Sequence, residues 1–322
     1  MTDPVRWGIL GAANFARTHM GPAIHAARGG TLVAIATSSA DKARPFAEFA
    51  PGLRVHEDYE ALVADPEIDA IYIPLPNHMH VDWAIRALES GKPVLCEKPL
   101  AMNVESFDKV IAARDRTGLL AAEAYMIVHH PQWQRAKQLY EERAIGDLVS
   151  VTAMFSFNNP DMTNIRNKAE TGGGSIPDIG VYIYGSARFV TGEEPAEILR
   201  ADITWENGVD TRAHVMARFP SFTYQGYTST RMAPFQEVVF HGTDGILKLS
   251  APFNAGVYGM AEVIVQDGKQ VVTSERFPGV NQYVAQVEAF NASLREGKPY
   301  ACPLEFSRGT QAMIDMVYAA AE

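Results

Sequence analysis

The sequence predicts an α/β protein, with a doubly wound parallel sheet first and an α+β domain with a large, mostly antiparallel sheet after it. Up to residue 125, short apolar segments alternate with amphipathic helical ones, as in parallel sheets covered on both faces. After Pro131, one helical stretch precedes several β-rich segments. With 322 residues, 47% of them apolar, the chain can form two domains. We expect one domain over residues 1–125 and a second over residues 126–322.

Six strands are expected in the first domain. They are Val5 to Leu10, Thr31 to Thr37, Arg54 to His56, Asp69 to Leu75, Pro93 to Cys96 and Leu119 to Tyr125. Apolar residues recur at helical spacing around Ala84 and around Val110, which predicts helices between the later strands.

In the second domain we expect a helix over Trp133 to Arg143 and a sheet after it. The expected strands are Leu148 to Phe157, Ala196 to Trp205, Ala213 to Phe219, Glu237 to Phe240 and Glu262 to Gln266. Two amphipathic stretches, Tyr283 to Arg295 and Glu305 to Ala320, close the chain.

Composition limits the classes of partner. The formal net charge is -10, whereas nucleic-acid binders usually carry a basic face, so we expect no nucleic-acid partner. No apolar run approaches the roughly 18 residues of a membrane span, and no export signal precedes the first strand, so we expect no membrane association. The two cysteines, Cys96 and Cys302, lie far apart without metal or disulfide spacing. These features predict a reduced, cytoplasmic protein.

The turn after the first strand predicts a dinucleotide site. Gly11 holds the tight-turn position of the pattern GxGxxG/A and Ala16 its close-packing position, but Ala13 replaces the glycine that lets phosphates approach. Chance alone often produces such a spacing; its place between a first strand and a helix indicates a Rossmann fold, with pyrophosphate at the helix N-terminus. The residues expected to contact the cofactor here are Gly11, Ala12, Ala13, Asn14 and Phe15.

The end of the second strand favours NADP over NAD. NAD-binding folds usually place an acidic residue there, but this chain has Thr37, Ser38 and Ser39, followed by Lys42 on the next helix. Small hydroxyls and a cation suit a 2′-phosphate. A serine cap on a solvated helix explains the same residues, and the two interpretations are compatible.

Further candidate cofactor contacts lie at the carboxyl end of the fourth strand, namely Leu75, Pro76, Asn77 and His80. We expect Asn77 to cap the following helix beside the nicotinamide ribose. His78 and His80 form an HxH pair, but no companion ligands stand at a familiar metal spacing, so no metal is predicted.

Glu97 and Lys98 directly follow the fifth strand. Ligands of doubly wound sheets bind beyond the carboxyl ends of the strands, so Lys98 is a candidate catalytic and cofactor-binding group and Glu97 a cofactor neighbour. A lysine at this place can also be a solvated loop residue.

Five segments together carry a family resemblance. They are Arg6 to Gly11, Pro76 to His80, Gly91 to Leu100, Glu123 to Tyr125 with His130-Pro131, and Gly172 to Tyr182. Over nearly the whole chain, this set resembles the glucose-fructose oxidoreductase, inositol dehydrogenase and rhizopine-catabolism family, usually called the Gfo/Idh/MocA family.

The resemblance implies that Lys98 is the catalytic lysine and that Asp178 and Tyr182 complete the site. Much of the family has histidine at the last position, so Tyr182 looks like the glucose-fructose oxidoreductase, xylose dehydrogenase and dimeric dihydrodiol dehydrogenase branch. That branch often carries arginine where this chain has Val128. The resemblance also implies a homodimer or homotetramer formed through the second-domain sheet.

Local chemistry fits these roles. Ser175 reads as a helix N-cap with Asp178 at the capping-box position, and Asp178 and Tyr182 are four residues apart on that helix. Tyrosine titrates near 10, so it needs a neighbouring cation to exchange protons near neutral pH. We expect Tyr182 to be the acid/base, Lys98 its activator and Asp178 an anchor for a substrate hydroxyl. Arg166 is either a substrate contact or a surface charge.

The expected function is therefore an NADP-dependent (or NAD-dependent) oxidoreductase that moves a hydride between nicotinamide and a sugar or polyol carbon. It would oxidise an aldose at C1 or reduce a ketose-type carbonyl. The alternatives are a trans-dihydrodiol or dicarbonyl reductase with the same residues, and a non-catalytic dinucleotide sensor of the same fold.

Overall fold

The computed structural model describes residues 3–321 and divides into two compact units. The first contains the chain up to His129 together with Asn281–Arg308, and the second contains His130–Val280 together with the chain from Gly309. The sequence-based boundary at residue 125 did not anticipate that Asn281–Arg308 folds with the N-terminal part. The physical reason is that this segment contains a helix that completes the core of the first unit.

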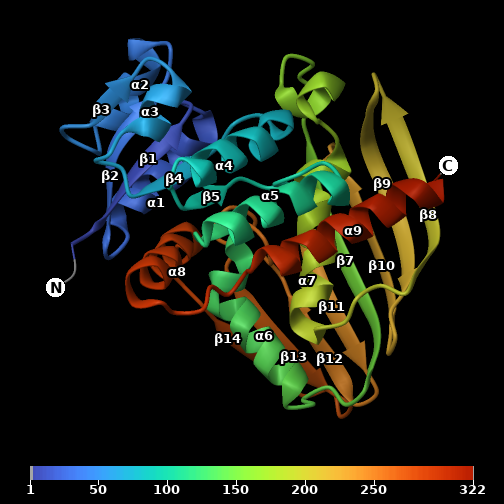
Figure 1. The fold of residues 1–322 in the computed structure, drawn as a ribbon. Coiled ribbons are helices and arrows are strands. Elements are labelled where there is room, and N and C mark those ends of the chain that lie inside the picture. The colour runs from blue at the N-terminus through green and yellow to red at the C-terminus, as the bar shows by residue number, and fades with distance from the viewer. Residues whose placement is uncertain (1–2, 322) are drawn as a thin grey trace. The chain divides into compact units, whose positions relative to one another are not determined.

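The first unit holds a six-stranded parallel sheet in the order β3-β2-β1-β4-β5-β6 (Figure 1). The strands are β1 (Val5–Leu10), β2 (Gly30–Ala36), β3 (Arg54–His56), β4 (Ala70–Ile73), β5 (Val94–Cys96) and β6 (Ala121–Glu123). The order reverses between β1 and β4, and this is where doubly wound sheets bind ligands. The predicted fold class is confirmed for this unit.

Helices cover both faces of that sheet. They are α1 (Gly21–Ala26), α2 (Ala40–Ala47), α3 (Tyr59–Ala64), α4 (His80–Glu89), α5 (Val104–Thr117) and α8 (Gln282–Glu296). One buried cluster joins the sheet to α3, α4 and α5, and a second joins the other face to α1, α2 and α8. Trp7 of β1 packs against Phe290 of α8, and its indole N–H donates to Asn291 Oδ1 at 3.0 Å. Helix α8 therefore supplies cover that the first 129 residues lack.

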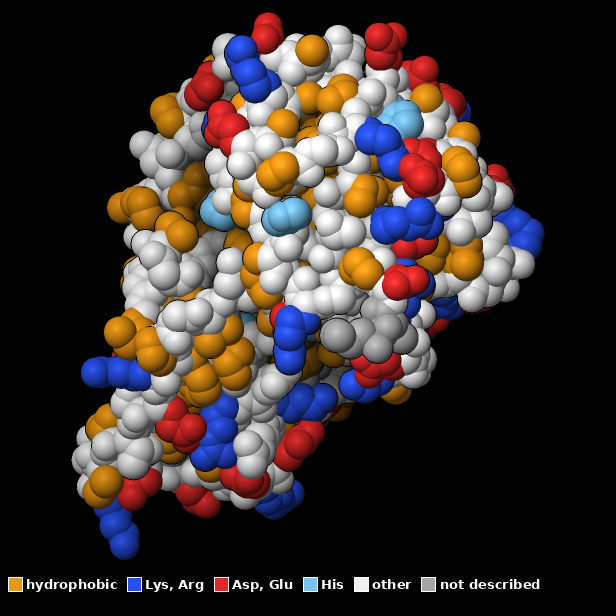
Figure 2. Space-filling model, turned by 90° about the vertical axis from the view of Figure 1, so that its left-hand side faces the viewer, with side chains coloured by type: hydrophobic (Ala, Val, Ile, Leu, Met, Phe, Trp, Pro, Cys, Tyr) orange, Lys and Arg blue, Asp and Glu red, His pale blue; other side chains and the backbone are white. Residues whose placement is uncertain are grey.

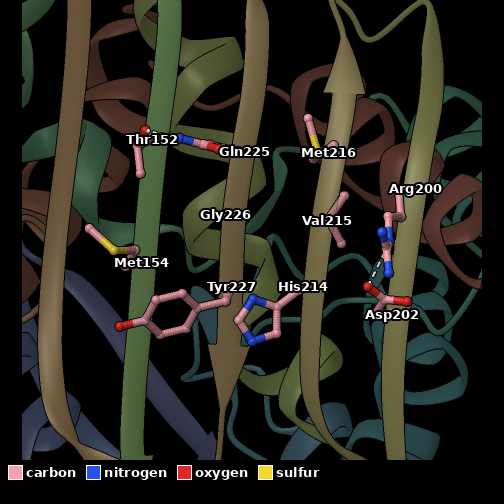
Figure 3. Close-up of a pocket in the computed structure, with 10 residues that line it drawn as sticks. All are labelled: Thr152, Met154, Arg200, Asp202, His214, Val215, Met216, Gln225, Gly226 and Tyr227. Atoms are coloured by element: carbon pink, nitrogen blue, oxygen red, sulfur yellow. Dashed lines mark hydrogen bonds and ion pairs between the residues drawn. The ribbon is translucent and has the colours of Figure 1, made fainter.

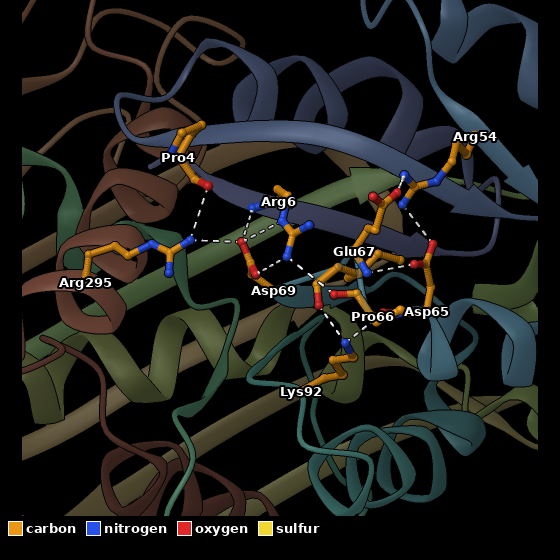
Figure 4. Close-up of polar contacts among 10 residues, drawn as sticks. Pro4, Arg6, Arg54, Asp65, Pro66, Glu67, Asp69, Lys92 and Arg295 are labelled. Atoms are coloured by element: carbon orange, nitrogen blue, oxygen red, sulfur yellow. Dashed lines mark hydrogen bonds and ion pairs between the residues drawn. The ribbon is translucent and has the colours of Figure 1, made fainter. Parts of the chain in front are cut away.

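An ion-pair network fastens α8 to the amino ends of the strands (Figure 4). Asp69, just before β4, accepts hydrogen bonds from Arg6 of β1 and, at 2.9 Å, from Arg295 of α8. Lys92 donates to the carbonyl oxygens of Asp65 and Ile68 at 2.8 and 2.6 Å. Burial alone would raise the pKa of Asp69, but its hydrogen bonds with Arg6 lower it. This network lies at the edge opposite the carboxyl ends of the strands.

The second unit is built on an eight-stranded sheet in the order β14-β13-β12-β11-β7-β10-β9-β8. The strands are β7 (Leu148–Asn158), β8 (Glu197–Glu206), β9 (Val209–Arg218), β10 (Thr223–Ser229), β11 (Arg231–Gly242), β12 (Gly245–Leu249), β13 (Glu262–Asp267) and β14 (Val272–Arg276). All neighbours are antiparallel except β7 and β10, which run parallel. The predicted mostly antiparallel sheet is confirmed.

Helix α7 (Val181–Thr191) contacts β7 and β10 and also packs against α6 (Pro131–Glu141). The C-terminal helix α9 (Leu304–Ala321) brings Tyr318 to this unit. Along β9, Ala213, Val215 and Ala217 are buried while His214 and Met216 are exposed. One face of the sheet therefore carries the core.

On the face drawn in Figure 2, basic and acidic side chains are interspersed. Such mixing produces no extended field of one sign on that face. Within residues 3–321, no helix combines the length and apolar character needed to cross a bilayer.

Candidate active site

The turn after β1 has the backbone that a dinucleotide phosphate site needs. Gly11 has φ +96°, and a Cβ there would stand 3.0 Å from Leu75 Cδ2, so the position favours glycine. Helical geometry begins at Asn14 and continues through a π-helical segment, Ala16–Met20, into α1. The first N–H groups of a helix have no partner within it and attract anions. Ala12 and Ala13 are half-buried, and their small side chains leave this end of the helix open.

The end of β2 is shaped by hydrogen bonds between its own residues. Ser39 Oγ accepts from the Lys42 N–H at 3.4 Å, which confirms the predicted serine cap of α2. Thr37 is buried and its Oγ1 accepts from the Ser39 N–H at 3.3 Å. Ser38 and the Lys42 side chain are exposed. A hydroxyl and a cation thus remain at the surface for a 2′-phosphate.

His80 is buried and faces the protein interior. Its Nδ1 lies 2.8 Å from the carbonyl oxygen of Pro99, and its Nε2 lies 2.7 Å from that of Leu75. Burial lowers the pKa of His80 to about 4, and a neutral ring donates to one of these acceptors at a time. His80 was predicted to contact the cofactor. In the structure its ring links the turn after β4 to the turn after β5.

Asn77 and Glu97 stand in the turns after β4 and β5. Asn77 is half-buried and is the first residue of a 3₁₀ turn, Asn77–Met79, that leads into α4. Glu97 accepts from the Tyr72 hydroxyl at 2.6 Å and from the Lys98 N–H at 3.3 Å. Burial raises the pKa of Glu97 despite these donors. Both Glu97 oxygens therefore support the turn that presents the half-buried Lys98.

In the second unit, Arg166 and Asp178 form an ion pair. Arg166 Nε donates to Asp178 Oδ2 at 2.7 Å, and the Asp178 side chain is only 13% exposed. Arg166 is therefore held against Asp178, and its role as a substrate contact stays a prediction. A Cβ on Gly173 would stand 2.5 Å from the Arg166 carbonyl oxygen, so glycine lets the Arg166 loop approach.

Asp178 and Tyr182 lie on one continuous helical stretch. A π-helical segment, Ile176–Gly180, carries Asp178, and α7 continues from it with Tyr182. π-helical turns are rare and often occur at functional sites. Ser175 holds the position before this segment, as predicted, but its torsions are helical and its side chain makes no cap hydrogen bond, so the predicted capping role is wrong.

Aromatic rings that the sequence analysis did not single out surround Tyr182. Its ring centroid lies 5.8 Å from that of Phe155 and 5.6 Å from that of Phe253. Tyr258 packs on Phe155, and its pKa is raised by burial and by the charge of Asp178. Phe253 and Tyr258 come from the segment between β12 and β13, where no periodic pattern marks them. Arg166, Asp178, Tyr182 and Tyr258 thus form a polar group with an apolar wall.

Lys98 belongs to the first unit, whereas Asp178 and Tyr182 belong to the second. Val128 is 1% exposed and part of the core. No group of three or more His, Cys, Asp or Glu side chains that could hold a metal ion occurs in the part of the chain that the structure describes.

A hollow of about 550 Å³ lies elsewhere, on the outer face of the second sheet (Figure 3). Its lining includes Met154, Met216, His214 and Tyr227, which stand on β7, β9 and β10. Tyr224, which alternates with Tyr227 along β10, instead donates to the carbonyl oxygen of Ile183 in α7. The hollow and the helix bearing Tyr182 thus lie on opposite faces of the sheet.

A dinucleotide turn in a doubly wound sheet, joined in one chain to a domain bearing Asp178 and Tyr182, defines a two-domain dehydrogenase-like protein. Comparison with known families agrees. The model described as "Oxidoreductase family, NAD-binding Rossmann fold" matches residues 5–125, and the "GFO/IDH/MocA C-terminal domain" matches residues 133–248. The chain belongs to the Gfo/Idh/MocA oxidoreductase family, as its motifs predicted.

Individual relatives span nearly the whole chain. D-xylose 1-dehydrogenase (NADP(+)) 2 of Haloferax volcanii is 34% identical over 98% of this chain and 97% of its own length. The crystal structure of a 3-ketoreductase from Actinomadura kijaniata with NADP and TDP-benzene has a TM-score of 0.91 at 28% identity, covering 99% of this chain and 98% of that one. A trans-1,2-dihydrobenzene-1,2-diol dehydrogenase of Xenopus laevis is 33% identical over 68% of this chain and 66% of its own.

Proposed function

We propose that this protein is an NADP-dependent oxidoreductase that transfers a hydride between nicotinamide and a sugar or polyol carbon. The observation that carries the proposal is the Arg166–Asp178 ion pair, whose Asp178 precedes Tyr182 by four residues in the same continuous helical stretch. Relatives named as a xylose dehydrogenase and a sugar 3-ketoreductase support a sugar-type substrate. The reaction would be aldose oxidation at C1 or reduction of a ketose-type carbonyl.

The cofactor would be held by the first unit, with NADP preferred to NAD. The residues that would hold it are Gly11 to Phe15 for the pyrophosphate, Ser38 and Lys42 for the 2′-phosphate, and Leu75 to Asn77 near the nicotinamide ribose. The solved relative with bound NADP supports this choice. Lys42→Ala should raise the Kd of NADP on the order of tenfold while leaving that of NAD unchanged. Lys109→Ala, which removes an exposed lysine of α5, is the matched control.

The chain's own residues would handle the proton and the substrate hydroxyls. A bound nicotinamide supplies or accepts the hydride. In the reductive direction, the Tyr182 hydroxyl would give its proton to the carbonyl oxygen; in the oxidative direction, its phenolate would take the hydroxyl proton. Lys98 would stabilise the phenolate. Asp178 would accept a hydrogen bond from a substrate hydroxyl.

There are two alternatives to this proposed function. The dihydrodiol dehydrogenase relative favours a trans-dihydrodiol or dicarbonyl substrate, which the same three residues would serve. A non-catalytic dinucleotide sensor has no need of Lys98, Asp178 and Tyr182 together. The presence of all three favours catalysis.

The decisive experiment measures nicotinamide absorbance with NADP or NAD against aldoses, inositols and trans-dihydrodiols. We expect turnover with one substrate class and its loss in Lys98→Ala. Turnover only with dihydrodiols would support the alternative enzyme. Tight NADP binding without turnover in either direction would contradict catalysis and favour the sensor.

We further propose that the protein is a homodimer or homotetramer that pairs through the outer face of the second sheet. The apolar and polar lining of the hollow in Figure 3 supports this face. Met216→Glu should lower the molar mass measured by light scattering; an unchanged mass would contradict the proposed interface.

A further inference from the structure

Asp210 is a buried carboxylate that the proposed chemistry does not use. It stands at the start of β9 and is 1% exposed. Its Oδ2 accepts from the Ser175 hydroxyl at 2.6 Å and from the Ile176 N–H at 2.8 Å. Its Oδ1 accepts from the Tyr318 hydroxyl of α9 at 2.8 Å. These three elements are far apart in sequence, and the carboxylate joins them.

The contacts of Asp210 concentrate at the beginning of the helix that carries Asp178 and Tyr182. Ile176 is the first residue of that helix, and its N–H is one of those left without an intrahelical acceptor. A negative charge at a helix N-terminus is stabilised by the helix dipole. Burial raises the pKa of Asp210, while the Ser175, Ile176 and Tyr318 donors lower it. Asp210 thus accepts a hydrogen bond from a free N–H at the start of this helix, which is the capping role predicted for Ser175.

Gly174 shows how closely the two segments approach. Its φ is +136°, and a Cβ there would stand 2.3 Å from Asp210 Oδ1. Gly174 is the last of three consecutive glycines, Gly172 to Gly174. Glycine is needed at Gly174 because the Asp210 side chain occupies the space where a Cβ would lie.

We propose that Asp210 is a positioning residue of the active site, which fixes the first turn of the Asp178–Tyr182 helix against β9 and α9. This inference rests on the proposed function of Asp178 and Tyr182. Asp178 lies two residues after Ile176, so movement of this first turn would displace the Asp178 carboxylate and, through the helix, the Tyr182 hydroxyl. A displacement of about 1 Å can reduce turnover on the order of a hundredfold.

The test compares Asp210→Asn with Arg188→Met. Asparagine keeps the size of Asp210 but turns an amide NH₂ toward one of its donors. Arg188 lies near the C-terminal end of the same helix and bonds Thr310 and Glu194, so its loss destabilises α7 away from the site. Both variants are assayed well below their melting temperatures.

We expect Asp210→Asn to lower kcat and raise KM on the order of tenfold each, with the Kd of NADP unchanged. Arg188→Met should lose stability but keep kcat and KM. Equal losses of kcat in both variants would show that Asp210 only stabilises the fold, which would overturn the proposal. Wild-type kcat and KM in Asp210→Asn would also overturn it.

A second readout does not depend on turnover. Amide hydrogen exchange over residues 176–182 should be on the order of tenfold faster in Asp210→Asn than in Arg188→Met. If the wild-type protein turns over no substrate, the proposed function fails, and the exchange rates alone decide whether Asp210 fixes the helix. If Asp210→Asn does not fold, Ser175→Ala and Tyr318→Phe each remove one donor. Unchanged exchange in both would overturn the proposal.

Discussion

His80 illustrates how a residue with a recognisable motif can have an unexpected role. It connects the carbonyl oxygens of Leu75 and Pro99 and so ties the cofactor turn to the turn that presents Lys98. His80→Ala should raise the Kd of NADP on the order of tenfold, since both buried carbonyls lose their shared donor. Nucleotide fluorescence titration measures this directly. His78→Ala, at an exposed position in the same turn, is the control; equal effects in both variants would contradict the linking role.

The residues that sequence analysis found are those with a local signature. Gly11, Lys98 and Asp178 stand at strand ends or helix starts, where the pattern of the chain places them. Asp210, Phe253 and Tyr258 carry no such signature because their importance comes from contacts with segments distant in sequence. Only the folded sheet brings Asp210 to Ser175, which lies 35 positions earlier in the chain.

Helix α8 shows that the contacts of a whole element with distant segments also leave no local signature in the sequence. Its own periodicity predicted a helix, but nothing local indicated that it would complete the first unit. Three strands also escaped prediction: β10 is interrupted by Gly226, β12 is short, and all residues of β14 are exposed, so none carries an extended alternation of apolar and polar residues.

The Asp69 network makes the attachment of α8 testable. Asp69→Asn removes the charge that Arg6 and Arg295 share, so we expect the free energy of unfolding to fall by about 1–3 kcal/mol in urea denaturation. Asp41→Asn removes an exposed ion pair with Arg44 and should cost less than about 0.5 kcal/mol. A similar loss in both variants would show that the network contributes no more than a surface pair.

The stability of the whole molecule should depend on pH through buried histidines. Burial lowers the pKa of both His129 and His130 to about 4, from an ordinary value near 6.5. His130 Nδ1 accepts from the Gln132 N–H, which requires the neutral ring. Between pH 6.5 and 4 the unfolded chain therefore binds protons that the folded chain does not, and stability falls as the pH falls.

Each histidine should contribute on the order of 3 kcal/mol to this loss, which urea unfolding at pH 7 and pH 4.5 measures. His130→Asn keeps an acceptor for the Gln132 N–H but cannot titrate. We expect its stability to fall less steeply with acid than that of the wild-type protein. An identical pH dependence would contradict the assignment to His130.

The central claim, that Tyr182 moves the proton in a nicotinamide-dependent reaction on a sugar-type substrate, is tested most directly by Tyr182→Phe. The measurement is kcat with the best substrate and NADP, beside the Kd of NADP. We predict a fall in kcat on the order of 10² to 10⁴ with the Kd unchanged, because phenylalanine keeps the contacts with Phe155 and Phe253 and loses only the hydroxyl. Turnover close to that of the wild-type protein would contradict the account.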